Sequence, residues 1–263
     1  MLETAWRAVE DDRHALSLGL AGSSSSADHE PLLHRQTLLV HGARVGRLLE
    51  ELAAVEKAGG GPALASYRPS AAEALELIAA AIRQDSNALE TLAIDQEFSP
   101  GAFESIVHLA AVSVLQQCAG QIEHQLLLHW REGYCPLCGA WPTLVERRGL
   151  DRSRRLRCGR CAADWEVPWL YCIYCGETNH NRLGSLATDE RGEQGKVETC
   201  ATCRGYLKSL PSLQGFSPLE LLLHDLETVE LDLVALDRDY RRPATNGFAL
   251  DLHVIDHASR PRL

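Results

Sequence analysis

The stretch CGRCAADWEVPWLYCIYCG, residues 158 to 176, carries two Cys-x-x-Cys pairs that are separated by ten residues. A further pair lies upstream and another downstream. The eight thiols are Cys135, Cys138, Cys158, Cys161, Cys172, Cys175, Cys200 and Cys203. A Cys-x-x-Cys turn brings two thiolates to one side of a tight loop, and two such turns complete a tetrahedral four-sulfur site for zinc or a single iron. The sequence therefore predicts two metal ions, each held by four cysteines.

Disulfide bonds are the competing interpretation of so many cysteines. The first 20 residues, MLETAWRAVEDDRHALSLGL, are acidic and interrupted by charges, so they lack the basic and apolar regions of a secretory signal. Apolar runs such as ALELIAAAI are far shorter than the roughly 20 residues that span a bilayer. We therefore expect a cytoplasmic chain without membrane insertion, and cytoplasmic thiols are kept reduced.

The four pairs combine most simply in sequence order, the first with the second and the third with the fourth. The loops between the joined pairs then have 19 and 24 residues, enough for a β-hairpin. Each half begins with a Cys-x-x-Cys-Gly pair, where Gly139 or Gly176 allows the positive φ that turns backbone amides towards the sulfurs. We predict two tandem ribbons, bridged by a strand-like segment over residues 162–171. A cross-braced pairing is the alternative.

The rest of the chain shows helical patterns. Residues 21–30 are typical of a flexible linker. Proline and capping signals predict helix starts at Pro31, Ser70, Pro100 and Ser217. The predicted fold class is α+β and multidomain: a helical domain (1–130), a tandem four-cysteine metal-ribbon module of two rubredoxin-like or zinc-ribbon units (131–212), and a C-terminal helix with a tail (213–263).

A basic loop lies between the first and second cysteine pairs. ERRGLDRSRRLRCGR, residues 146–160, holds seven arginines and two acidic residues in a chain of net charge -10. The loop is interpreted as a solvated hairpin, a docking surface for an acidic partner, or a phosphate-contacting patch. The negative net charge opposes nucleic acid, so we do not expect nucleic acid to be the ligand. The candidate partner-binding residues are Arg147, Arg148, Arg152, Arg154, Arg155, Arg157 and Arg160.

The helical region shows none of the sequence motifs of an enzyme. It has no phosphate-cradling glycine loop, no nucleophile elbow and no paired-histidine zinc helix. The sequence therefore indicates a protein that is not an enzyme. Rubredoxin-like electron transfer and nucleic-acid binding by zinc ribbons are the alternatives that the cysteines and arginines leave open.

Four segments together resemble the formate dehydrogenase accessory protein family, FdhE. They are CPLCGAWP from 135, RLRCGRCAADWEV from 155, KVETCATCRGYLKSL from 196 and HDLETVELDLVALDRDYRR from 224. Generic zinc ribbons share neither the Tyr-Leu-Lys of residues 206–208 nor the acidic C-terminal helix. The resemblance implies a helical domain joined to two rubredoxin-like modules, with the eight cysteines as ligands and iron as the metal, although four thiolates alone suit zinc as well. It also implies an accessory protein that binds the catalytic subunit of formate dehydrogenase in the cytoplasm and is required for its activity.

Overall fold

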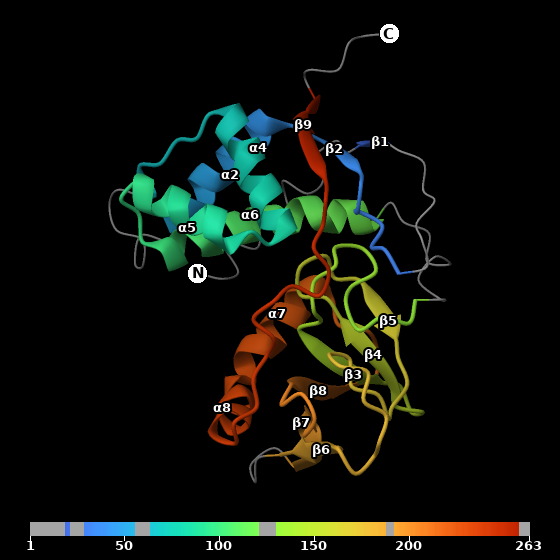
Figure 1. Cartoon of the computed structure of the whole chain (residues 1–263). Coiled ribbons are helices and arrows are strands. Elements are labelled where there is room, and N and C mark those ends of the chain that lie inside the picture. Colours follow the sequence, from blue (N-terminus) through green and yellow to red (C-terminus); the bar gives the residue numbers. More distant parts are fainter. Residues whose placement is uncertain (1–18, 22–28, 56–63, 121–129, 188–191, 258–263) are drawn as a thin grey trace. The chain divides into compact units, whose positions relative to one another are not determined.

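A computed structural model describes residues 19–21, 29–55, 64–120, 130–187 and 192–257. Contacts between residues divide the chain into two compact units (Figure 1). The first unit contains residues 1–25, 32–121 and 249–263, and the second contains residues 26–31 and 122–248. Most of the predicted linker over residues 21–30 lies outside the described residues, as does the N-terminal segment in which we expected no secretory signal.

Helices dominate the described part of the first unit. They are α2 (Gly42–Val55), α4 (Ala71–Arg83), α5 (Ser86–Asp95) and α6 (Pro100–Gly120). The capping signal at Ser70 is confirmed, because its side chain accepts a hydrogen bond from the N–H of Glu73 and the Glu73 carboxylate accepts one from the N–H of Ser70. The start at Pro100 is also confirmed. Helix α4 packs against α2, α5 and α6 to form the centre of this unit.

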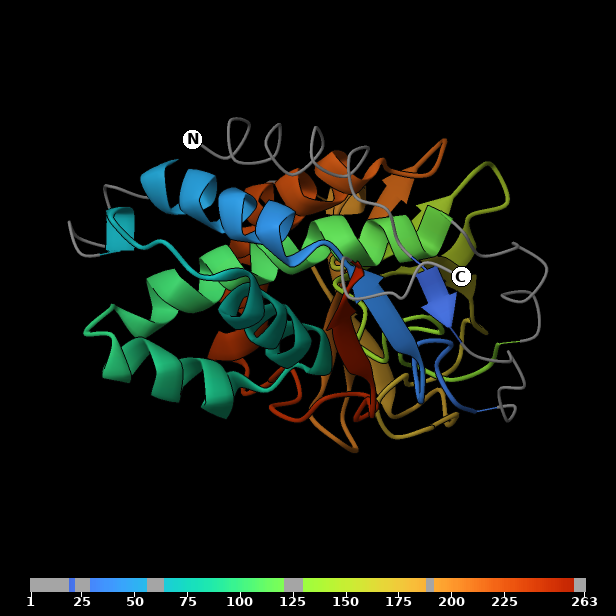
Figure 2. The ribbon, with the colours of Figure 1, turned by 90° about the horizontal axis from the view of Figure 1, so that it is seen from above.

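The prediction that a helix begins at Pro31 is wrong. Strand β2 (Thr37–Val40) precedes α2, which begins only at Gly42. This strand pairs in parallel with β9 (His253–Asp256) and antiparallel with β1 (Gly19–Ala21), so the helical unit also contains a three-stranded sheet (Figure 2). A short apolar run suits a buried strand as well as a helix. The partner β9, which decides between them, lies near the other end of the chain.

Helix α6 has the length and apolar composition of a membrane-spanning helix. In the structure, 61% of its most apolar stretch is buried inside the protein. Phe103, Val107 and Leu115 are among its buried side chains, and α2, α4 and α5 pack against the helix. Its burial pattern is therefore that of a core helix.

The second unit is organised around one mixed sheet (Figure 1). Its described strands are β3 (Leu144–Arg148), β4 (Ser153–Arg157), β5 (Asp164–Glu166), β6 (Leu183–Leu186), β7 (Lys196–Cys200) and β8 (Tyr206–Ser212). The strand order is β5-β4-β3-β8-β7-β6, and a short 3-10 helix, η3 (Gly192–Gln194), precedes β7. All neighbours are antiparallel except β3 and β8, which run in parallel. Two three-stranded ribbons are thus fused into a single sheet.

The strand in the bridge between the ribbons is shorter than the strand-like segment predicted over residues 162–171. Strand β5 covers only Asp164–Glu166, with Trp165 completely buried. Pro168 follows, and proline has no N–H to donate to a strand ladder. Trp169, the next residue, is 47% exposed. The segment therefore leaves the sheet after Val167 and presents its second tryptophan to the surface.

The predicted C-terminal helix is two helices, α7 (Pro218–Glu227) and α8 (Val229–Asp237). Ser217 and Glu220 form the expected capping box at the start of α7. The break falls at Thr228, where φ is -113° and the side-chain hydroxyl donates to the carbonyl of His224 at 2.6 Å. The helices pack on the sheet through one apolar cluster, made of Leu144, Val197, Tyr206, Leu210, Leu221, Leu231 and Ala235.

The chain folds back on itself after α8. Residues 249–257 belong with the first unit, where the N–H of Arg35 donates to the carbonyl of Asp251 at 2.6 Å and β9 pairs with β2. Helices α7 and α8 belong with the second unit. The predicted division into 1–130, 131–212 and 213–263 stays a prediction, and the contacts group the C-terminal segment differently.

Candidate metal centres

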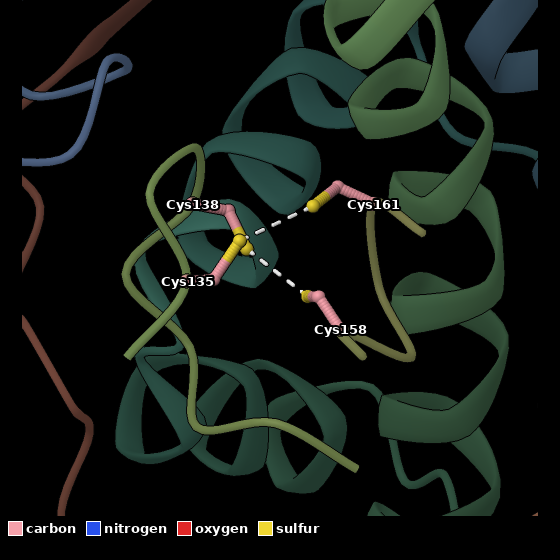
Figure 3. Close-up of side chains that lie close together, drawn as sticks. All are labelled: Cys135, Cys138, Cys158 and Cys161. Carbon is pink, nitrogen blue, oxygen red and sulfur yellow. Dashed lines mark hydrogen bonds between the residues drawn. The ribbon is translucent and has the colours of Figure 1, made fainter. Parts of the chain in front are cut away.

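The eight cysteines gather in two groups of four. Cys135, Cys138, Cys158 and Cys161 form the first centre, and Cys172, Cys175, Cys200 and Cys203 form the second. Within each group all four sulfur atoms lie within 4.8 Å of one another. Figure 3 shows the first centre, in which the turn with Cys135 and Cys138 faces the turn with Cys158 and Cys161. The structure therefore joins the pairs in sequence order and does not adopt the cross-braced alternative.

The spacing of the sulfur atoms fits a tetrahedral ion. The Sγ–Sγ distance is 3.4 Å between Cys135 and Cys161 and 3.5 Å between Cys138 and Cys158. The corresponding distances in the second centre are 3.7 Å and 3.8 Å. Four thiolates about 2.3 Å from one zinc ion lie about 3.8 Å apart at the corners of a tetrahedron. Both groups could hold a metal ion, and the four-sulfur set suits zinc and iron alike.

One hydrogen-bonding pattern recurs in the turns that carry the thiols. In the first turn the N–H of Cys135 donates to the carbonyl of Ala140 at 2.8 Å, and the N–H of Gly139 donates to the carbonyl of Cys135 at 3.0 Å. The turns that begin at Cys158 and Cys172 make the same two bonds, and the turn at Cys200 makes the first of them. Three of the four loops therefore make the same complete turn, and the fourth shares its closing bond.

The residue after the second cysteine has a positive φ in every turn. The values are 68° at Gly139, 61° at Ala162, 74° at Gly176 and 59° at Arg204. The two glycines reveal this conformation in the sequence, but Ala162 and Arg204 do not. The guanidinium of Arg204 donates to the carbonyls of Arg238 and Asp239 and stacks 4.2 Å from the Tyr240 ring. These contacts fasten the fourth turn to the end of α8.

Backbone amides also point at the sulfur atoms. The N–H of Leu137 lies 3.4 Å from Sγ of Cys135, and the N–H of Gly205 lies 3.4 Å from Sγ of Cys203. Such bonds stabilise thiolate charge and tune the properties of a bound metal. Both centres thus carry the supporting contacts that a tetrathiolate metal site needs.

The protein by itself does not favour four thiolates in the first centre, where every cysteine is buried. Burial raises the pKa of Cys135 and of Cys161 well above the usual range. Hydrogen bonds from Cys135, Cys158 and Cys161 instead lower the pKa of Cys138. A bound cation would favour the deprotonated form of the group, since metal binding displaces the thiol protons.

The second centre is more open. Cys172 and Cys200 are buried, whereas Cys175 and Cys203 are exposed. Burial raises the pKa of Cys172, and it raises the pKa of Cys203 to about 11. Burial acts in the same direction on Cys200. Hydrogen bonds from the backbone N–H groups of Cys203 and Thr202, together with those from the Cys172 and Cys175 thiols, outweigh burial and lower the pKa of Cys200. A metal in this centre would have sulfur ligands in contact with solvent.

Comparison with known proteins gives a family match for part of this chain. Residues 170–249 match the family model described as FdhE, C-terminal domain. This segment contains the second centre, strands β6 to β8 and both C-terminal helices. The resemblance to the FdhE family is confirmed.

Curated FdhE relatives match the chain over different lengths. Protein FdhE homolog of Rhizobium meliloti (strain 1021) is 26% identical over 211 residues, which are 78% of this chain and 65% of the relative. Protein FdhE homolog of Stutzerimonas stutzeri (strain A1501) is 38% identical over 115 residues, which are 43% of this chain and 37% of the relative. The matched segments thus span less than two thirds of these relatives.

A solved structure supports the shared fold. The crystal structure of the FdhE protein from Pseudomonas aeruginosa has a TM-score of 0.58 with this chain, covers 93% of it, and is matched over 86% of its own length at 20% sequence identity. Together with the two four-cysteine groups, this likeness confirms the predicted combination of helices with zinc-ribbon-like modules.

The FdhE-like Tyr-Leu-Lys segment has a structural role in this chain. Lys208 is completely buried, and its ammonium lies 2.5 Å from the Asp225 carboxylate and 2.8 Å from that of Asp232. The hydroxyl of Tyr206 donates to Asp232 at 2.8 Å, and Arg242 pairs with both aspartates. This cluster ties α7 and α8 to β8. The segment by itself does not reveal these partners, because the aspartates lie on two later helices, α7 and α8.

Several of the candidate partner-binding arginines form ion pairs inside the second unit. Glu146 is completely buried and pairs with Arg157 and, at 2.5 Å, with Arg148. Arg148 also lies 2.7 Å from Asp164, which pairs in addition with Arg155. These contacts hold β3, β4 and β5 together and neutralise much of the basic loop.

The remaining candidates divide by exposure. Arg154 is buried and pairs with Glu198 at 2.8 Å, which links the two ribbons through β4 and β7. Arg147 is buried as well, Arg160 is half-buried and Arg152 is exposed. The solvated-hairpin and phosphate-patch interpretations therefore do not describe Arg147, Arg154 and Arg157. A docking role for the more exposed arginines stays a prediction.

Proposed function

We propose that this protein is a cytoplasmic accessory factor that binds the catalytic subunit of formate dehydrogenase and is required for the activity of that enzyme. The observation that carries the proposal is the match of residues 170–249 to the FdhE C-terminal domain. In this role the chain provides a binding surface and does not itself convert a small molecule.

The two four-cysteine centres support this role physically. Each centre ties together short turns that have little apolar core of their own, and a structural metal supplies folding free energy to such loops. Cys135, Cys138, Cys158 and Cys161 would hold one ion, and Cys172, Cys175, Cys200 and Cys203 the other. The ions are zinc or iron, with iron implied by the family resemblance. Elemental analysis together with a visible absorption spectrum separates the two metals.

The basic loop contributes a narrower docking surface than the full set of seven arginines. Arg152 is exposed, and Arg148, Arg155 and Arg160 are half-buried. We propose these four side chains as contacts for an acidic patch on the dehydrogenase, which makes the association sensitive to salt. Arg154 and Arg157 are unsuitable for a docking test, because reversing a buried charge would damage the fold itself. Reversing Arg148 carries the same cost, because it pairs with the buried Glu146.

A deletion strain tests the proposal. Without this protein, the dehydrogenase polypeptide should still be made but should be inactive. The wild-type gene should restore activity, as should Arg47→Glu, a control on the exposed side of α2. The double variant Cys135→Ser/Cys172→Ser should not restore it. Normal formate dehydrogenase activity in the deletion strain, with no paralogue present, contradicts the proposal.

Rubredoxin-like electron transfer is a second candidate function, and one observation favours it. Cys175 and Cys203 bring sulfur ligands of the second centre to the surface, where an electron partner could approach. This function requires iron. Reversible bleaching of the visible spectrum by a reductant would support it, whereas a colourless, zinc-loaded native protein would exclude it.

A further inference from the structure

A cavity of about 240 Å³ lies in the second unit against the second centre. Cys172 and Cys200 contribute to its lining, together with residues of β6, β7 and β8 and the segment 169–174. The family resemblance assigns no role to this cavity.

The cavity occupies the face of the sheet opposite to α7 and α8. Val197 on β7 belongs to the apolar cluster under the helices, so its neighbours Lys196 and Glu198 point to the other face, because side chains alternate along a strand. Leu207 pairs with Glu198 across the ribbon and shares that face. All three residues line the cavity, so α7 and α8 do not cover these side chains, and the segment 169–174 lies at this face instead.

Two large apolar side chains stand at this cavity. Trp169 is 47% exposed and the adjacent Leu170 is 58% exposed. They follow Pro168, where the bridge segment leaves the sheet. Single exposed apolar residues are common, but two adjacent ones beside a concave site indicate a surface for binding.

The charges differ between the two ends of the cavity. At the end lined by Cys172 and Cys200, a zinc ion with four thiolates would carry a net negative charge, so an acidic group is favoured only at the end near Trp169. Arg154 and Glu198 neutralise each other in a pair with an N–O distance of 2.8 Å. The remaining cation is Lys196, whose ammonium lies 6.0 Å from the centroid of the Trp169 ring. In the described part of the chain, no carboxylate forms an ion pair with Lys196. One uncompensated positive charge thus lies beside an aromatic surface.

Among the described strands, β6 forms the edge of the sheet beside the same cavity. β6 is the last strand in the sheet order, with β7 as its partner, and Leu183, Gly184 and Ser185 of β6 line the cavity. Backbone groups on the outer side of an edge strand can pair with an added peptide strand. The cavity is smaller than the roughly 300–1,000 Å³ of pockets for drug-sized ligands, which suits one or two side chains of a peptide.

We propose that this cavity binds an extended peptide segment of a client protein. The segment pairs with β6, packs an apolar side chain against Trp169 and Leu170, and places a carboxylate at Lys196. The inference rests on the proposed function, since the client would be the dehydrogenase subunit. Because Cys172 and Cys200 line the cavity, an occupant also contacts the second centre on its buried side. Binding to the metal-loaded form stabilises that form and slows the loss of its metal.

Phage-displayed random heptapeptides, selected on the full-length zinc-loaded protein, test this proposal. The enriched peptides should carry Asp or Glu within two positions of a bulky apolar residue. Synthetic blocked copies should bind the wild type at least about tenfold more tightly than Lys196→Glu or Trp169→Ala, a loss of about 1.4 kcal/mol. Lys196→Glu should also shift the preference towards peptides with Lys in place of the acid. Arg47→Glu, which alters charge outside the cavity, should bind as the wild type does.

A second readout follows the metal. A chromophoric zinc chelator should remove zinc from the second centre more slowly when the selected peptide is present, and Trp169→Ala should abolish this protection. Leu170→Ser replaces Trp169→Ala if the latter variant binds less than two equivalents of zinc. No enrichment of acidic–apolar peptides, or equal binding by the cavity variants and the wild type, overturns the proposal.

The results also separate this inference from the proposed function. If the peptides bind as expected but the deletion strain keeps normal formate dehydrogenase activity, the accessory role fails and the cavity stands as a peptide site. If the deletion abolishes activity but Lys196→Glu and Trp169→Ala restore it fully and bind the peptides normally, the cavity proposal fails alone.

Discussion

Lys208 on β8 is completely buried, and its ammonium lies 2.8 Å from the carboxylate of Asp232 on α8. The two residues are 24 positions apart in the sequence. Asp225 and Arg242 complete a cluster in which the buried lysine has two anionic partners. A buried ammonium is tolerated only when it is paired and hydrogen-bonded, so this contact specifies where the helices dock on the sheet.

Replacing Lys208 with methionine should destabilise the second unit by about 3 kcal/mol. The change leaves Asp225 and Asp232 without their buried partner, although Arg242 still neutralises part of their charge. Urea denaturation of the zinc-loaded protein, followed by circular dichroism, measures the loss. Arg238→Met, at an exposed position after α8, should change stability by less than about 0.5 kcal/mol. If Lys208→Met lowers the free energy of unfolding by less than about 1 kcal/mol, the cluster contributes little to stability.

The Asp232 carboxylate should remain ionised in acid. Burial alone would raise its pKa, but the hydrogen bonds from Lys208 and Tyr206 and the charge of Arg242 outweigh burial and lower the pKa of Asp232. Its stabilising contribution is therefore complete at neutral pH and is lost only as the pH falls through the lowered, folded-state pKa. Carboxyl-carbon NMR on cadmium-loaded protein should show Asp232 mainly ionised at about pH 3.9, where an unperturbed aspartate is half protonated. Half protonation at or above this pH would refute the expectation.

Removing one ligand from either centre should release one ion. Cys135→Ser and Cys172→Ser should each bind about one equivalent of metal instead of two, as measured by elemental analysis, because each centre needs its own four thiols. Cys118→Ser, at the buried cysteine of α6 outside both centres, should keep two. Because β3 and β8 join the ribbons in one sheet, each single variant should lower the melting temperature of the whole second unit. Loss of both ions from a single variant would show that the centres cannot be occupied independently.

The second centre should lose its metal and react with thiol reagents first. Cys175 and Cys203 are exposed, whereas all four cysteines of the first centre are buried. Treatment with N-ethylmaleimide and a zinc chelator, followed by peptide mass spectrometry, should label the second centre about tenfold faster than the first, since thiol reactivity follows access. Cys118 is buried and lies outside both centres, so it provides the slow reference. Equal labelling rates for the two centres would contradict the prediction that the exposed cysteines of the second centre react first.

The glycines after the first and third cysteine pairs should differ in their tolerance of alanine. Both have positive φ, which costs a residue with Cβ about 1–2 kcal/mol. An added Cβ at Gly139 would lie 2.8 Å from the carbonyl oxygen of Phe248, while at Gly176 it would meet no atom within 4 Å. Gly176→Ala should therefore cost about 1 kcal/mol and Gly139→Ala about 3 kcal/mol. Thermal unfolding of the two zinc-loaded variants measures the difference, and equal losses would show that backbone conformation alone matters.

Much of the metal-binding architecture can be predicted from short segments. A Cys-x-x-Cys turn closes through hydrogen bonds within six residues, such as the bond from Cys135 to Ala140, so its geometry is encoded locally. The capping boxes at Ser70 and Ser217 are local in the same way, and both are confirmed. The loop lengths between the pairs indicated the sequential arrangement of the centres, which the structure adopts.

Other features depend on residues that are far apart in the sequence. The TLLV run of β2 is a strand because β9 supplies its partner, and the two ribbons form one sheet because β3 meets β8. The sequence of the basic loop indicated arginines at the surface. Arg154 is nevertheless buried, and it pairs with Glu198 of the other ribbon. Local spacing by itself determined the four thiol turns, since their bonds lie within a few residues. Only the tertiary structure decided which strands, charges and helices pair, because each of those contacts needs a partner that the neighbouring sequence does not contain.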